Sequence, residues 1–91
     1  MTVKIVIPTP LRQFTNNQDA VMVEGETVGA VLFRLTENNP ALRRHLFADD
    51  GRIRGFVNVF VNNEDIRFLQ KEKTPVREND VISIIPSIAG G

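Results

Sequence analysis

The chain has 91 residues, enough for one small domain, and its eleven basic side chains balance eleven acidic ones, so it lacks the positive field of a nucleic-acid-binding protein. It contains no cysteine, which excludes disulfides, thiolate catalysis and cysteine-ligated metal centres and fits a cytoplasmic protein. No apolar run approaches the length of about 20 residues that a membrane span needs, and the first residues lack the pattern of a secretory signal.

Two strands are predicted at the start of the chain. Residues 3–7 alternate between apolar and other side chains with a period of two, and Pro8 ends this strand. Residues 20–24 provide an antiparallel partner, and Asn16-Asn17 between them have the chemistry of a turn. We therefore expect a hairpin with a long loop.

A helix is predicted to follow this hairpin. Thr27 is a good N-cap, because its hydroxyl accepts a hydrogen bond from an N–H group of the first turn. Apolar residues then recur at helical spacing at Val28, Val31, Leu32 and Leu35. The helix should end near residues 38–39, and Pro40 favours the first turn of a second short helix that continues through residues 41–47.

Three more strands are predicted in the second half. Residues 56–62 place Val57, Val59 and Val61 on one face, and Asn62-Asn63 begin a turn before a short strand at residues 66–68. The last strand covers residues 81–85.

This order of elements predicts an α+β fold of the β-grasp (ubiquitin-like) type. A mixed sheet of about five strands would pack on one main helix, with a short helix beside it and the two terminal strands parallel at the centre of the sheet. We expect the domain to cover residues 1–86 and a flexible di-glycine tail to cover residues 87–91.

The same alternation predicts an apolar patch on the outer face of the sheet. Ser83 and Asn58 mark the solvent side of their strands, which also carries Ile85 and Phe60, and Phe68 of the short neighbouring strand would join them. Exposed apolar patches often mark docking sites for partners. In the alternative arrangement, Phe60 or Phe68 turns into a peripheral layer of the core.

The Gly90-Gly91 pair follows a predicted strand almost directly. Glycine has no Cβ, so this pair can enter a narrow tunnel that excludes larger residues, and the carboxyl group of Gly91 would then be the most deeply presented group of the protein. This pattern predicts a carrier whose chemistry takes place at its own C-terminus.

No other residues form a persuasive catalytic or metal-binding set. His45 is the sole histidine and lies on a predicted amphipathic turn, where a partly exposed structural role is favoured. The acidic pairs at residues 49–50 and 64–65 lack the spacing of calcium or zinc ligands, and no glycine-rich phosphate loop is present. We expect no bound cofactor and no catalytic side chain.

Residues 80–91, which end in Pro-Ser-Ile-Ala-Gly-Gly, resemble the C-termini of ubiquitin-like sulfur carriers of the MoaD/ThiS family. Residues 7–12 and 56–68 resemble the branch of that family that serves cysteine biosynthesis. The likeness covers nearly the whole chain. It implies that Gly91 is the site of adenylate and sulfur attachment, that Gly90, Ala89 and Ile88 thread into a partner, and that Ile85 contributes to docking.

The resemblance also implies partners. An E1-like adenylyltransferase/sulfurtransferase would use ATP and a sulfide source to convert the terminal carboxylate into a thiocarboxylate. In the cysteine branch, a pyridoxal-phosphate-dependent (PLP-dependent) cysteine synthase accepts the sulfur, and a metalloprotease releases the cysteine that is left on the tail.

Three alternatives stay open from the sequence. The thiocarboxylate could serve molybdopterin synthesis, as a small subunit of the synthase, or the formation of the thiamine thiazole. The chain could instead be a protein modifier that is conjugated to lysines through Gly91. Finally, it could be a plain β-grasp interaction module in which the two glycines are only a tail.

Overall fold

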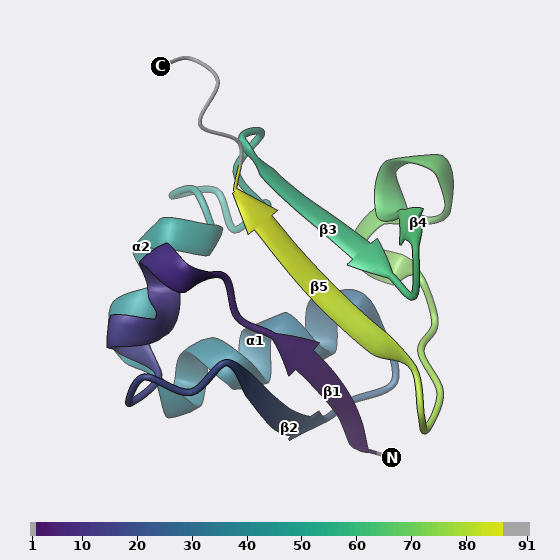
Figure 1. The fold of residues 1–91 in the computed structure, drawn as a ribbon. Helices are drawn as coiled ribbons and strands as arrows, with labels where there is room; N and C mark the ends of the chain where they lie inside the picture. Colours follow the sequence, from purple (N-terminus) through teal and green to yellow (C-terminus); the bar gives the residue numbers. More distant parts are fainter. Residues whose placement is uncertain (1, 87–91) are drawn as a thin grey trace.

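The computed structural model describes residues 2–86, and these residues form one five-stranded mixed sheet with helices on one face (Figure 1). The strand order is β2-β1-β5-β3-β4, and only β1 and β5 run parallel. The strands are β1 (Thr2–Val6), β2 (Ala20–Glu24), β3 (Val57–Val61), β4 (Glu64–Asp65) and β5 (Val81–Pro86). This topology confirms the predicted β-grasp fold, including the parallel pairing of the two terminal strands.

Helix α1 (Val28–Asn38) packs its apolar side against the sheet. The Thr27 hydroxyl accepts a hydrogen bond from the Ala30 N–H at 3.1 Å, as an N-cap should. The apolar residues that were predicted at helical spacing are all buried, and they meet the inward side chains of the strands, such as Ile5, Val59 and Ile82. Within residues 2–86, no helix is both long enough and apolar enough to cross a membrane.

The predicted second helix is present as two short pieces that follow α1 directly. A 3-10 turn, η2 (Pro40–Leu42), leads into α2 (Arg43–Leu46). Another 3-10 helix, η1 (Thr9–Phe14), lies in the loop between β1 and β2 and was not predicted. Pro10, in its first turn, has a backbone φ that suits the start of a helix, and Pro8, which ends β1, is its N-cap residue.

The predicted strand at residues 66–68 is wrong. These residues form a 3-10 helix, η3 (Ile66–Phe68), and the strand that pairs with β3 is the two-residue β4 before it. The Asp65 carboxylate accepts a hydrogen bond from the Arg67 N–H at 2.9 Å, and the Leu69 N–H bonds to the Ile66 carbonyl. These local bonds turn the chain away from the ladder, because short polar side chains compete with strand pairing for the backbone.

Gly25, between β2 and α1, sets the close approach of the chain to the helix. A Cβ at this position would lie 2.6 Å from Val31 Cγ2 and 3.0 Å from the Val31 amide nitrogen. We therefore expect Gly25→Ala to lower the free energy of unfolding by about 1–3 kcal/mol, as overpacking does. Urea denaturation measures this loss, and Gly55→Ala is the matched control because no atom lies within 4 Å of a Cβ there. Equal stability of the two variants would contradict the packing argument.

Candidate functional site

The central strand β5 leads directly into the tail that was predicted to be functional. It pairs with β1 on one side and with β3 on the other, and its last pairing joins Pro86 to Val57. Hydrogen-bonded neighbours therefore fix the direction of the chain up to this point (Figure 1). The predicted attachment site Gly91 and the predicted threading residues Gly90, Ala89 and Ile88 lie outside the described residues.

The outer face of the sheet brings Ile85 and Phe60 together. Ile84 is 2% exposed and points into the core, whereas Ile85 is 50% exposed on the opposite face. In the antiparallel register, Ile85 lies opposite Asn58 and Phe60 lies opposite Ser83. Ile85 and Phe60 are therefore diagonal neighbours, about 7–8 Å apart at their Cα atoms, which is within reach for an aromatic side chain. The predicted placement of both residues on the outer face is confirmed.

Phe68 does not belong to this register. It was expected on a strand beside β3, but it lies on η3, where it is 86% exposed. The alternation of a strand therefore says nothing about its orientation. It is a separate exposed aromatic residue near the β4 edge of the sheet.

Phe56 is a candidate that the sequence analysis missed. It is 51% exposed and immediately precedes Val57, the residue that pairs with Pro86 at the end of β5. It lies in a turn that the Val57 N–H closes by bonding to the Arg54 carbonyl, so strand alternation does not assign its side chain to a face. We call Phe56, Phe60 and Ile85 the tail-root patch.

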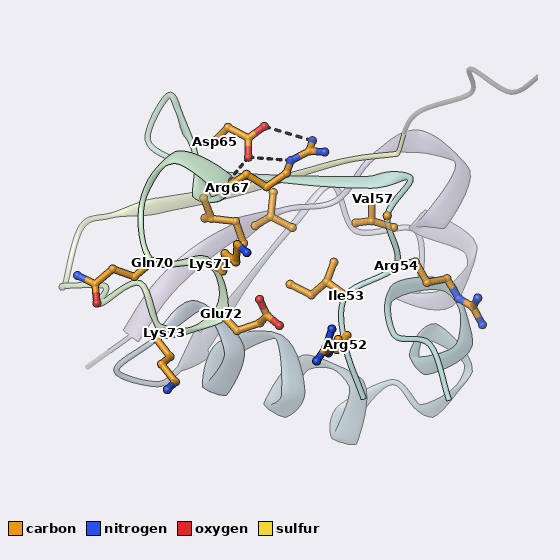
Figure 2. Close-up of a pocket in the computed structure, with 13 residues that line it drawn as sticks. Arg52, Ile53, Arg54, Val57, Asp65, Arg67, Gln70, Lys71, Glu72 and Lys73 are labelled. Carbon is orange, nitrogen blue, oxygen red and sulfur yellow. Dashed lines mark hydrogen bonds and ion pairs between the residues drawn. The ribbon is translucent and has the colours of Figure 1, made fainter. Parts of the chain in front are cut away.

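A polar network borders the tail-root patch at the edge of the sheet. The Arg67 guanidinium donates a hydrogen bond to Asp65, and its Nη2 lies 3.2 Å from Asp65 Oδ2 (Figure 2). It also donates to Asn58 Oδ1 on β3. Because Asn58 lies opposite Ile85, this network spans the outer side of β3 next to the patch. The side-chain hydrogen bond from Arg67 lowers the pKa of the Asp65 carboxyl below its usual value, helped by the backbone N–H of the same residue.

The direction of this shift fixes how the network responds to pH. A carboxyl group with a lowered pKa in the fold contributes stability above its unfolded pKa and loses it as the pH falls through the folded value. The Asp65 carboxyl is therefore ionised at neutral pH, and its contribution to the network is lost only in acid.

His45 has a structural environment. Its ring stacks on Phe14 with the centroids 4.6 Å apart. Its Nε2 atom is buried, and no hydrogen-bond partner for it is found in the part of the chain that the structure describes. Among residues 2–86, no group of three histidine, cysteine, aspartate or glutamate side chains is placed to hold a metal ion.

Comparisons with known proteins agree with the fold and with the family resemblance. The model of the ThiS family matches residues 5–91. The chain is 38% identical to the "Sulfur carrier protein CysO" of Mycobacterium tuberculosis (strain ATCC 25618 / H37Rv) over the whole length of both chains. Among solved structures, it is similar to Mycobacterium tuberculosis CysO, with a TM-score of 0.87 and 35% identity over 94% of this chain and 99% of that one. It is also similar to a chain in the Amycolatopsis orientalis BexX/CysO complex, with a TM-score of 0.89 and 31% identity over 98% and 99% of the two chains.

Proposed function

The chain belongs to the ThiS family, and on that premise we propose that it is a sulfur carrier protein of the CysO type. The single observation that supports this function best is the similarity to a sulfur carrier over the entire length of both chains, tail included. In this proposal the protein is not an enzyme. Its working group is the carboxyl carbon of Gly91.

The chemistry requires a partner, because a terminal carboxyl group has a pKa of about 3.5 and is an unreactive anion at neutral pH. An E1-like activating enzyme would let the Gly91 carboxylate attack the α-phosphorus of ATP, so that an acyl adenylate forms and pyrophosphate leaves. A sulfide equivalent would then attack the acyl carbon. The C–S bond forms, the bond to AMP breaks, and a thiocarboxylate remains on the carrier.

The described fold supports this role by presenting the tail from a rigid base. β5 pairs with β1 at residues 81–83 and with β3 as far as Pro86, so β3 holds the chain in the sheet up to the start of the tail. Five extended residues reach about 17 Å, which is enough to enter a cleft from a docked surface. Gly90 and Gly91 add no side chains that would block a narrow passage.

Docking to the activating enzyme would use the tail-root patch. Phe56 and Ile85 are half exposed and adjoin Val57 and Pro86, the last pair of the sheet before the tail, and Phe60 extends the patch along β3. Covering exposed apolar groups of this kind removes them from water and stabilises the complex with a partner. Phe68 would contribute only to a partner that also reaches η3.

The presence of the thiocarboxylate can be tested directly. We expect the chain isolated from its native host under sulfur-replete growth to show the mass of a carrier in which one oxygen has been replaced by sulfur. A thiol-alkylating reagent should label this species at its C-terminus, and the chain has no cysteine that could react instead. Intact-mass and tandem mass spectrometry measure both results. An unmodified, unlabelled chain under every growth condition would contradict the proposal.

The acceptor of the sulfur is a second, separable question. We propose cysteine formation by a PLP-dependent cysteine synthase, followed by a metalloprotease that releases the cysteine from the tail, on the basis of the similarity to CysO. The purified thiocarboxylate can be incubated with an activated serine and the synthase, with a molybdopterin precursor and its synthase, or with a thiazole precursor and its synthase. Consumption of sulfur in the first reaction alone supports the proposal, whereas covalent adducts on lysines would favour a modifier.

A further inference from the structure

The edge of β3 that faces β4 is only partly covered. β4 pairs with Phe60 and Val61, and no strand pairing is present beyond that point along this edge within the described residues. The Asn62 N–H donates to the Val81 carbonyl on β5, so residues of the other parity in β3, Val57 and Val59, direct their backbone groups toward the opposite side. That side is the edge of β3 that β4 covers only at Phe60 and Val61. The Val57 N–H is already bonded to the Arg54 carbonyl at 2.9 Å, so that amide is not available to a partner.

A cavity of about 520 Å³ follows this edge. Figure 2 shows its two walls, with the loop that carries Arg52, Ile53 and Arg54 on one side and the segment of Gln70, Lys71 and Lys73 on the other. Val57, Val59 and Ile66 contribute apolar atoms to the lining. The cavity lies on the helix side of β3, because the side chains of Val57 and Val59 point away from the outer face that carries Phe60.

The charges around the cavity are strongly uneven, although the whole chain is neutral. Five basic residues and two acidic ones contribute atoms to its lining: Arg52, Arg54, Arg67, Lys71, Lys73, Asp65 and Glu72. Arg67 and Asp65 already pair with each other. Arg52 also has an acidic neighbour outside the lining, because its Nε lies 4.0 Å from Asp50 Oδ2. Within residues 2–86, neither lysine forms an ion pair, so the remaining field at the cavity is positive.

One of these lysines is held in an unfavourable backbone conformation. Lys71 has a φ of 53°, whereas the other non-glycine residues with positive φ in the described chain are asparagines. Left-handed geometry is costly for a side chain such as lysine, and backbone strain of this kind tends to collect at binding sites. The turn around it is fixed by hydrogen bonds from the Thr74 N–H to the Lys71 carbonyl and from the Gln70 N–H to the Thr74 hydroxyl.

We propose that this cavity binds an extended acidic peptide segment of a partner protein, which adds a strand to the free edge of β3 between the basic side chains. Main-chain groups of the edge would bind the peptide backbone, and the basic walls would select its carboxylates. A nucleic acid is a poorer fit, because the lining contains no aromatic side chain on which bases could stack. The site is distinct from the tail-root patch, so one partner could hold the carrier at both places or two partners could bind together.

The test uses the full-length chain and a fluorescein-labelled hexapeptide of alternating glutamate and valine. The variant Arg52→Gln/Lys71→Gln/Lys73→Gln should weaken binding about tenfold, as measured by fluorescence anisotropy. The control Lys4→Gln/Arg34→Gln/Arg77→Gln removes the same charge from positions outside the cavity lining and should leave the affinity within about twofold. Equal weakening by the two triple variants would overturn the proposal.

Two further measurements separate strand addition from simple charge attraction. Peptide binding should slow amide hydrogen exchange at Val59, and N-methylation of the peptide backbone should weaken binding about tenfold, because methylation removes its hydrogen-bond donors. Unchanged exchange at Val59, or full binding of the methylated peptide, would overturn the assignment. Tighter binding of a single-stranded oligothymidylate than of the peptide would replace it with a general polyanion site.

The variant Lys71→Gly separates an effect on peptide affinity from an effect on the stability of the fold. This variant relieves the left-handed strain, so its thermal unfolding midpoint should rise while its affinity for the acidic peptide falls. A purely structural Lys71 would change only the first of these two quantities, and unchanged affinity would remove it from the site. Failure of the unaltered chain to bind the peptide at millimolar concentration would overturn the proposal and leave the basic residues as protection of the edge against pairing with another chain.

Discussion

Deletion of Gly91 is expected to reduce formation of the thiocarboxylate by at least about 100-fold. The deletion withdraws the carboxyl carbon by the length of one residue, about 3.3–3.6 Å, and displacements of about 1 Å in a reacting group already cost rates of this order. The residue lies beyond β5, so the thermal unfolding midpoint should stay unchanged. Intact mass spectrometry after incubation with the activating enzyme, ATP and sulfide measures the effect, and normal sulfur loading of the truncated chain would contradict the proposed function.

A chain with one leucine added after Gly91 is the complementary control. It retains every native residue and moves the reactive carboxyl group away from the phosphate of ATP, so it should also fail to load sulfur. Proteolytic removal of the added leucine should restore loading to the native level. Loading of the extended chain without removal would show that the position of the last carbonyl does not matter.

The second large effect is expected from Ile85→Asp. This substitution places a charge in the tail-root patch, and a central docking residue of this kind contributes about 2 kcal/mol or more, which corresponds to a rise of about 30-fold in the KM of the activating enzyme for the carrier. Ile85 is half exposed, so the free energy of unfolding should fall by no more than about 1 kcal/mol. Steady-state activation kinetics and urea denaturation measure the two quantities on the same protein.

Two matched variants show whether the effect belongs to docking. Met22→Asp makes the same change at a 63% exposed residue on the distant strand β2, and the KM should rise less than about threefold. Ile84→Ala alters the buried neighbour of Ile85 and should lower the free energy of unfolding by about 2–5 kcal/mol. If Ile85→Asp unfolded the protein as Ile84→Ala does, the residue would belong to the core, and an unchanged KM would remove it from the docking surface.

Most of the sheet and the main helix were predictable because their signals are local. The period-two alternation of β3 and β5 assigned Val59, Ile82 and Ile84 to the core, and the structure buries all three. The Thr27 cap and the helical spacing after it likewise predicted α1, and the structure confirms both. In each case the side chains that one element must bury stand at fixed intervals in the chain.

Residues 66–68 mark the limit of this reasoning. Their apolar composition favoured a strand, but the Asp65 carboxylate bonds the Arg67 N–H, and the chain turns into η3 instead. Phe68 therefore lies on η3 and not on the outer face of the sheet, where strand alternation would place it. A choice between a side-chain hydrogen bond and a ladder bond depends on where β3 lies, which a local pattern does not contain.

The sequence by itself determined the alternation, the helix cap, the neutral balance of charge and the cysteine-free composition, because each is a property of residues close together or of simple counts. Only the tertiary structure decided that basic residues from separate segments of the chain lie around one cavity. It alone also showed that β4 stops after two residues and leaves part of β3 uncovered. Both follow from contacts between segments far apart in the chain, and their geometry is set by the packing of the whole sheet against α1.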